Sequence, residues 1–204
     1  MGPYPTKDFS HLLGTPGFSD ALLNQHFGLY KGYVTNVNAL QEELARVPGK
    51  PPAPAWSELK RRFGWEWNGM RLHEIYFGNM TRKKVALTES SRLRKRLAAD
   101  FGSFDAWSGN FKATAGLRGI GWAALVWDAE EGRFFNVWIE EHDGGHLAGC
   151  SVILLMDAFE HAFLTDYGTK RADYIEAFFG AIDWAAVEGR LSVAAAPALE
   201  MVRA

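Results

Sequence analysis

Apolar residues recur every three or four positions in two long stretches of the N-terminal half, which predicts two helices. The first begins after Ser19, a typical helix-capping residue, and its apolar stripe continues to Leu44. The second extends from Ser57 to Phe77. The segment 47–55 between them contains four prolines, and a proline disrupts a helix interior. The pattern therefore predicts a helical hairpin.

Further helices are predicted on both sides of a central region with a different pattern. Residues 88–100 are charged and helical in character, and Ser103 precedes another helical stretch. Helical spacing returns within 157–184. The small residues after Ala194 predict a frayed tail.

The central region carries the pattern of strands. Residues 121–129 and 133–141 are rich in aromatic and branched side chains and flank a short turn, which predicts a β-hairpin. Residues 150–158 form a continuous apolar run typical of a buried strand. The element order predicts an α+β fold, with an all-helical domain at 1–81 and a mixed domain at 82–204.

Composition narrows the possible classes of protein. The chain has 204 residues, of which 48% are hydrophobic and 14% aromatic, so a full core is expected and disorder is not. A formal net charge of -2 argues against nucleic-acid binding by bulk electrostatics. The single cysteine, Cys150, excludes a disulfide within the chain and a cysteine-based zinc site.

The location of the protein is predicted from two features of the sequence. The N-terminal residues lack the apolar segment of a secretory signal. No apolar stretch approaches the length of a membrane span. We therefore expect a cytoplasmic protein without membrane association.

Histidines and one aspartate are the candidate metal ligands. Asp157 and His161 are spaced i, i+4, which would place both on one face of a helix, close to the end of an apolar strand. Their simplest alternative is a capping aspartate and a packed histidine. His26 and His73 lie on the apolar faces of the two predicted hairpin helices. Three imidazoles and one carboxylate would suit iron, manganese or zinc.

A second histidine pair has weaker support. His142 and His146 are also spaced i, i+4, but Gly144 and Gly145 between them favour a loop. A structural role, or a role beside the metal ligands, is the better interpretation.

At this point the sequence resembles the iron/manganese superoxide dismutase family. The resemblance rests on residues 18–38 and 68–77, on the hairpin region at 101–107 and 119–126, and on 157–179. Its most specific motif is Asp-x-x-Glu-His-Ala followed by Asp-Tyr, formed here by Asp157, Glu160, His161, Ala162, Asp166 and Tyr167. The resemblance implies an N-terminal helical hairpin followed by a domain with a three-stranded antiparallel sheet packed with helices.

The resemblance also implies an activity and a set of ligands. One iron or manganese ion per subunit would be bound by His26, His73, Asp157 and His161. The activity would be disproportionation of superoxide, a small anion, to oxygen and hydrogen peroxide. The partners would be copies of the chain, in a homodimer that could pair further into a tetramer. Glu160 would reach across the dimer interface to the other subunit's His161.

Residues beside the ligands match the family less completely. Tyr33 matches the tyrosine near the substrate funnel and Trp122 a tryptophan that lines the site. Leu29 or Tyr30 occupies the neighbourhood of a funnel histidine, and Leu164 stands where a gateway tyrosine is usual. Two family tryptophans are replaced by phenylalanines, Phe77 and Phe159.

The most informative departure concerns a glutamine that tunes the metal. Iron-type members carry it four residues before the second ligand, where this chain has Gly69. Manganese-type members supply it from the region where this chain has His142. We expect His142 to hydrogen-bond the solvent ligand and shift the redox potential, which leaves iron and manganese both open.

Two alternatives stay open. The chain could be another mononuclear non-haem iron or manganese enzyme that activates oxygen, since two histidines and a carboxylate suffice for that chemistry. It could also be a metal-binding homologue without turnover, because the funnel residues are altered.

Overall fold

The computed structural model describes residues 2–46 and 54–201, with side chains described through residue 196. In chain order its elements are η1 (Ser10–Leu12), α1 (Asp20–Arg46), α2 (Pro54–Phe77), α3 (Arg92–Phe101), α4 (Phe104–Ala115), β1 (Gly121–Asp128), β2 (Arg133–Glu140), β3 (Ser151–Asp157), η2 (Glu160–Ala162), α5 (Leu164–Tyr167), α6 (Arg171–Gly180) and α7 (Trp184–Met201). This order confirms the α+β class. The division into domains at 81/82 stays a prediction.

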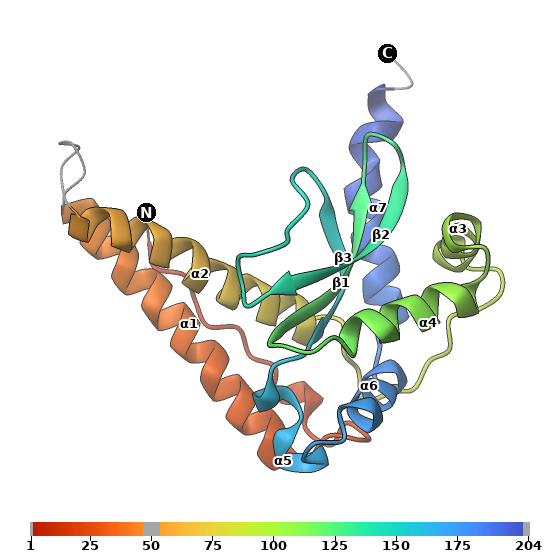
Figure 1. Ribbon diagram of the computed structural model, residues 1–204, viewed down its shortest axis with the longest axis horizontal. Helices are drawn as coiled ribbons and strands as arrows, with labels where there is room; N and C mark the ends of the chain where they lie inside the picture. The colour runs from red at the N-terminus through yellow and green to blue at the C-terminus, as the bar shows by residue number, and fades with distance from the viewer. Residues whose placement is uncertain (1, 47–53, 202–204) are drawn as a thin grey trace.

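The two N-terminal helices form the predicted hairpin, in which α1 and α2 lie side by side (Figure 1). Ser19 caps α1, because its Oγ accepts a hydrogen bond from the Leu22 amide at 3.1 Å. Asp166 of α5 accepts hydrogen bonds from the Ser19 amide and hydroxyl, both at 2.6 Å, and so ties α5 to the start of α1. The second helix begins at Pro54, earlier than predicted, because the first helical position needs no amide hydrogen. The rest of the predicted proline-rich link, 47–53, lies outside the described residues.

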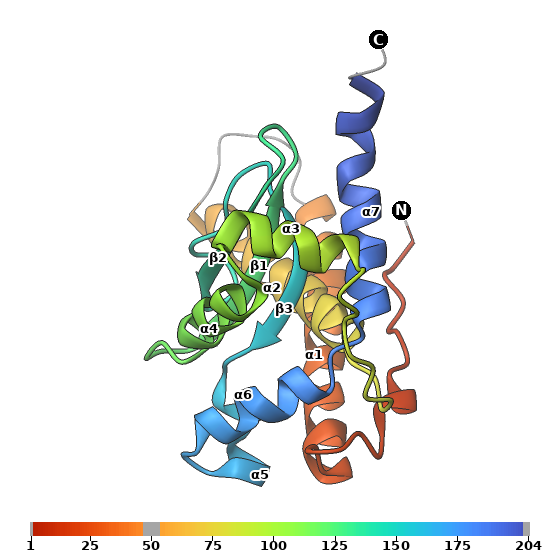
Figure 2. The ribbon, with the colours of Figure 1, turned by 90° about the vertical axis from the view of Figure 1, so that its right-hand side faces the viewer.

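The three strands form an antiparallel sheet in the order β2-β1-β3. Its central strand β1 is buried except at Asp128, since β2 and β3 flank it and α4 packs against it. Strand β3, at one edge of the sheet, contacts α2 and α7 (Figure 2). Trp122 pairs with Asp157 at the end of β3, which directs this end of the sheet toward the helical hairpin.

The C-terminal segment differs from the prediction. Instead of a frayed tail after Ala194, α7 continues to Met201, and its far end projects beyond the sheet (Figure 1). Three consecutive alanines, the strongest helix formers, favour this extension. Within the described residues, no helix combines the length and apolarity needed to cross a membrane.

Asn79 joins the end of α2 to the outer edge of β3. Its side chain is completely buried, accepts a hydrogen bond from the Leu155 amide at 3.1 Å and donates one to the Leu155 carbonyl at 3.1 Å. It also donates to the Tyr76 carbonyl at 2.7 Å. The amide group thus takes the place of a neighbouring strand at this edge.

Asn79→Ala is therefore expected to lower the free energy of unfolding by about 2 kcal/mol, because it leaves buried backbone groups of β3 unpaired. Chemical denaturation of the metal-loaded protein measures the change. Asn24→Ala on the exposed face of α1 is the matched control and should change stability little. Equal stabilities of the two variants would mean that Asn79 does not support β3.

Candidate metal centre

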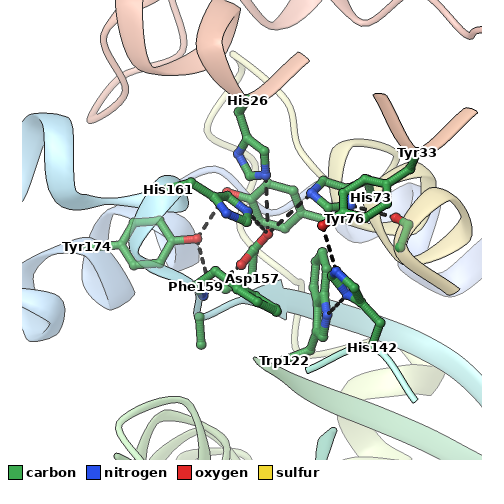
Figure 3. A network of polar contacts seen from close by, with 12 residues as sticks. His26, Tyr33, His73, Tyr76, Trp122, His142, Asp157, Phe159, His161 and Tyr174 are labelled. Atoms are coloured by element: carbon green, nitrogen blue, oxygen red, sulfur yellow. Dashed lines mark hydrogen bonds and ion pairs between the residues drawn. The ribbon is translucent and has the colours of Figure 1, made fainter. Parts of the chain in front are cut away.

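Four separate elements bring the four predicted ligands together. His26 comes from α1, His73 from α2, Asp157 from the end of β3 and His161 from η2. One ligand atom from each lies within 4.8 Å of the others. In Figure 3 the Asp157 carboxylate lies in the middle, with the three imidazoles around it. Contrary to the prediction, Asp157 and His161 do not share a helix face, because Asp157 ends strand β3 and His161 lies in the 3-10 helix η2.

Asp157 is fixed on every side. Its Oδ2 lies 3.2 Å from His26 Nε2 and 3.1 Å from His161 Nε2, while Oδ1 accepts the Phe159 amide at 2.8 Å. The Tyr174 hydroxyl donates to the Asp157 backbone carbonyl at 2.8 Å. The carboxylate is completely buried. Burial of an ionised carboxylate is costly without a cation nearby.

His73 provides the test of whether these residues fit a metal. Its Nδ1–H donates to the Gly69 carbonyl at 2.6 Å, which directs the Nε2 lone pair toward Asp157. Nε2 is buried, has no hydrogen-bond partner among the described residues and lies 3.7 Å from Asp157 Oδ2. A lone pair facing a carboxylate oxygen at this distance needs a cation between them. The residues therefore fit a bound metal ion.

The protonation states also suit metal binding. Burial lowers the pKa of His26 and brings that of His73 well below its usual value, so both rings are neutral. Burial alone would raise the pKa of the Asp157 carboxyl, but His161 and His26 outweigh burial and hold it well below its usual range. Burial would lower the pKa of His161, but the neighbouring Asp157 carboxylate raises it, so a metal ion would have to displace a proton from this ring. Neutral imidazoles and an ionised carboxylate are the forms that bind metals.

A second layer connects Tyr33, His142 and Trp122. The Trp122 indole N–H, which can only donate, bonds His142 Nδ1 at 3.1 Å. Burial lowers the pKa of His142 to about 4, so the ring is neutral and carries its one proton on Nε2. Nε2–H then donates to the Tyr33 oxygen at 2.7 Å. As a result, the Tyr33 hydroxyl can donate its own proton elsewhere.

Gly69 has a role that the sequence did not reveal. A Cβ at this position would lie 2.5 Å from Tyr33 Cδ1, so only glycine lets the Tyr33 ring lie against α2. This contact explains why Gly69 replaces the glutamine expected from the resemblance. The space of that side chain is filled by Tyr33, whose ring is tilted against that of His73 with 5.1 Å between the ring centroids.

Other supporting residues carried no signal in the sequence. Tyr174 is paired with both Asp157 and the Tyr76 hydroxyl, and Trp65 lies 4.5 Å from the His142 ring. His146, predicted in a loop, bonds the His142 carbonyl at 2.9 Å and thus has a structural role. The ligand cluster is the only group of potential metal-binding side chains found within the described residues.

The fold and this site define a class of protein: a helical hairpin and a small sheet that enclose a buried cluster of three histidines and one aspartate suited to one metal ion. Residues 89–190 match the family model for the C-terminal domain of iron/manganese superoxide dismutases. The chain is 36% identical to manganese superoxide dismutase 2 of Haloferax volcanii over 170 residues, covering 83% of this chain and 84% of that protein.

Two relatives that are named as iron superoxide dismutases are matched over a larger share of their length. The chain is 34% identical to the iron superoxide dismutase of Aquifex pyrophilus, with 95% of this chain and 94% of that protein covered. The same identity holds for the iron superoxide dismutase of Saccharolobus solfataricus, with 86% of each chain covered. The chain belongs to the iron/manganese superoxide dismutase family.

Proposed function

We propose that this chain is a superoxide dismutase that converts two superoxide anions and two protons into oxygen and hydrogen peroxide. One iron or manganese ion per subunit is bound by His26, His73, Asp157 and His161. The observation that carries this proposal is the buried His73 Nε2. It has no hydrogen-bond partner among the described residues and faces the Asp157 carboxylate. The proposal includes a cytoplasmic location, as expected from the sequence.

Electrostatics and proton supply follow from the residues of the chain. A bound iron or manganese ion supplies one-electron chemistry by alternating between its trivalent and divalent states. Asp157 is the only anionic ligand, so the loaded site keeps a net positive charge that attracts superoxide. The Tyr33 hydroxyl accepts from His142 Nε2–H at 2.7 Å, so its own proton is free to be donated to the reduced substrate. Solvent supplies the second proton and restores the one that Tyr33 gives up.

The choice between iron and manganese falls to residues beside the ligands. Relatives named for each metal are similar to this chain to about the same degree, 36% and 34% identity. We propose that His142 tunes the redox potential of the ion, in the place where family members use a glutamine. Both ring nitrogens of His142 are bonded, to Trp122 and to Tyr33, so the expected direct hydrogen bond to a solvent ligand is replaced by action through Tyr33. The His142 ring lies 6.1 Å from that of His73.

Superoxide consumption by protein loaded separately with iron and with manganese tests the proposed function, with metal content quantified. We expect activity in at least one form and none in His161→Ala. Full metal content without activity in either form would instead favour an oxygen-activating enzyme or a homologue without turnover.

We also propose that the enzyme is a homodimer, which could pair further into a tetramer, with Glu160 bonded to the partner's copy of His161. The side chain of His161 is 24% exposed, whereas those of the other three ligands are 1% exposed or less. His161 is therefore the ligand that a second copy can reach. Leu29 on α1 and Leu164 at the start of α5 expose apolar surface, 43% and 52% respectively.

Glu160→Ala is expected to raise the dimer dissociation constant about 100-fold, because two symmetric charged hydrogen bonds are lost. Light scattering across a dilution series measures this constant. Glu130→Ala, at an exposed turn between β1 and β2, is the control and should leave it unchanged. A dimer equally strong in both variants would exclude the bridge.

A further inference from the structure

His142 reaches the site from a tight loop that follows β2. The loop is closed by two hydrogen bonds between Glu140 and Gly144, from amide to carbonyl in each direction, at 2.9 Å and 3.1 Å. Glu141, the first residue of the loop, has a φ of 47° and is the only residue other than glycine with a positive φ in the described part of the chain. This conformation is unfavourable for a side chain with a Cβ, and glutamate gains no local hydrogen bond there as asparagine does.

Two contacts from distant parts of the chain hold Glu141 in this conformation. Its amide donates to the Ile120 carbonyl at 3.1 Å. Its carboxylate accepts a hydrogen bond from the Trp65 indole at 2.9 Å, across 76 residues of sequence. The Glu141 side chain is exposed, so water alone could satisfy its carboxylate. Burial therefore does not force the hydrogen bond to the Trp65 indole.

The Trp65 ring contacts both His142 and Tyr33. Its centroid lies 4.5 Å from that of His142 and 5.7 Å from that of Tyr33. The Arg62 guanidinium stacks on Trp65 at 4.0 Å and is itself bonded to Glu66 at 2.8 Å. Trp65 is thus fixed on α2 and covers the hydrogen bond between His142 and Tyr33.

We propose that Trp65 and Glu141 form a latch, the hydrogen bond between their side chains, that positions His142 against Tyr33. Both are positioning residues, because neither contacts the ligands. The latch fixes the loop in its unfavourable backbone conformation and so fixes the direction of His142 Nε2–H. This inference rests on the proposed function, in which His142 acts on the redox potential of the bound metal.

A double-mutant cycle tests the latch in the metal-loaded enzyme. Trp65→Phe keeps an aromatic ring but removes the indole donor. Glu141→Asn tolerates the left-handed conformation, and its shorter side chain lacks the carboxylate that accepts the hydrogen bond from Trp65. Trp67→Phe is the matched control, because Trp67 lies on the same helix, contacts Arg71 at 5.0 Å and packs against Tyr4.

Two measurements are made on each variant: hydrogen exchange of residues 138–146 by mass spectrometry, and the midpoint potential of the bound metal. We expect Trp65→Phe to speed exchange in this segment about tenfold relative to Trp67→Phe and to shift the potential. In the Glu141→Asn background, the same change should have little further effect on either measurement.

Either of two results would overturn the proposal. Exchange no faster than in Trp67→Phe would mean that the latch does not hold the loop. Faster exchange with an unchanged potential would mean that it stabilises the loop without positioning His142. Absence of superoxide consumption by the wild-type enzyme counts against the proposed function alone, since neither measurement depends on turnover.

Discussion

Asp157→Asn is expected to remove the bound metal and to lower superoxide consumption by more than about 100-fold, beyond the range for losing an outer-shell partner. The carboxylate supplies the only negative charge among the four ligands, and its Oδ2 lies 3.1 Å and 3.2 Å from two imidazole nitrogens. An amide of the same size keeps the volume but not the charge. Metal analysis after purification and a superoxide assay measure the two losses.

A second aspartate, Asp128, provides the matched control for Asp157→Asn. Asp128 ends the neighbouring strand β1, at the opposite end of the sheet from the site, so Asp128→Asn should keep full metal content and activity. Circular dichroism shows whether each variant is folded, since an unfolded protein would lose metal for another reason. A folded Asp157→Asn variant that retains metal and activity would contradict the ligand assignment.

The candidate ligands could be picked out from the sequence because each combines a metal-binding side chain with an apolar surrounding. His26 and His73 lie on helix faces that the spacing alone places toward the core, and both are buried there. Two helix starts, those of α1 and α4, could also be predicted; Ser103, for example, caps α4 by accepting the Ala106 amide at 2.9 Å. Local patterns of this kind need no knowledge of distant contacts.

The supporting residues could not be predicted, because their roles depend on contacts between distant segments. Gly69 reads as a weak point in a helix until Tyr33 is seen to lie where its Cβ would be. Trp65 and Glu141 are 76 residues apart, and the backbone conformation of Glu141 is unusual for its residue type. Tyr174 reaches a backbone carbonyl of Asp157, which leaves no trace in the pattern of side chains.

Metal removal is expected to destabilise the folded protein, because a ligand that binds only the folded state stabilises it by mass action. At a free metal concentration about 1,000 times the dissociation constant, the loss is about 4 kcal/mol. The structure supplies the physical reason: without a cation, the buried Asp157 carboxylate lies 3.7 Å from His73 Nε2, which has no hydrogen-bond partner in the described part of the chain. Denaturant unfolding of the metal-loaded and chelated protein measures the difference.

Asp157→Asn separates this effect from general binding of metal to the surface. Its stability should not change when metal is added or chelated, because the site that links binding to folding has been removed. Asp128→Asn should respond to metal as the wild type does. If chelation leaves the wild-type unfolding midpoint unchanged although the metal has been removed, the ion contributes nothing to folding, and the hydrogen bonds of Asp157 to Phe159 and Tyr174 hold this region without it.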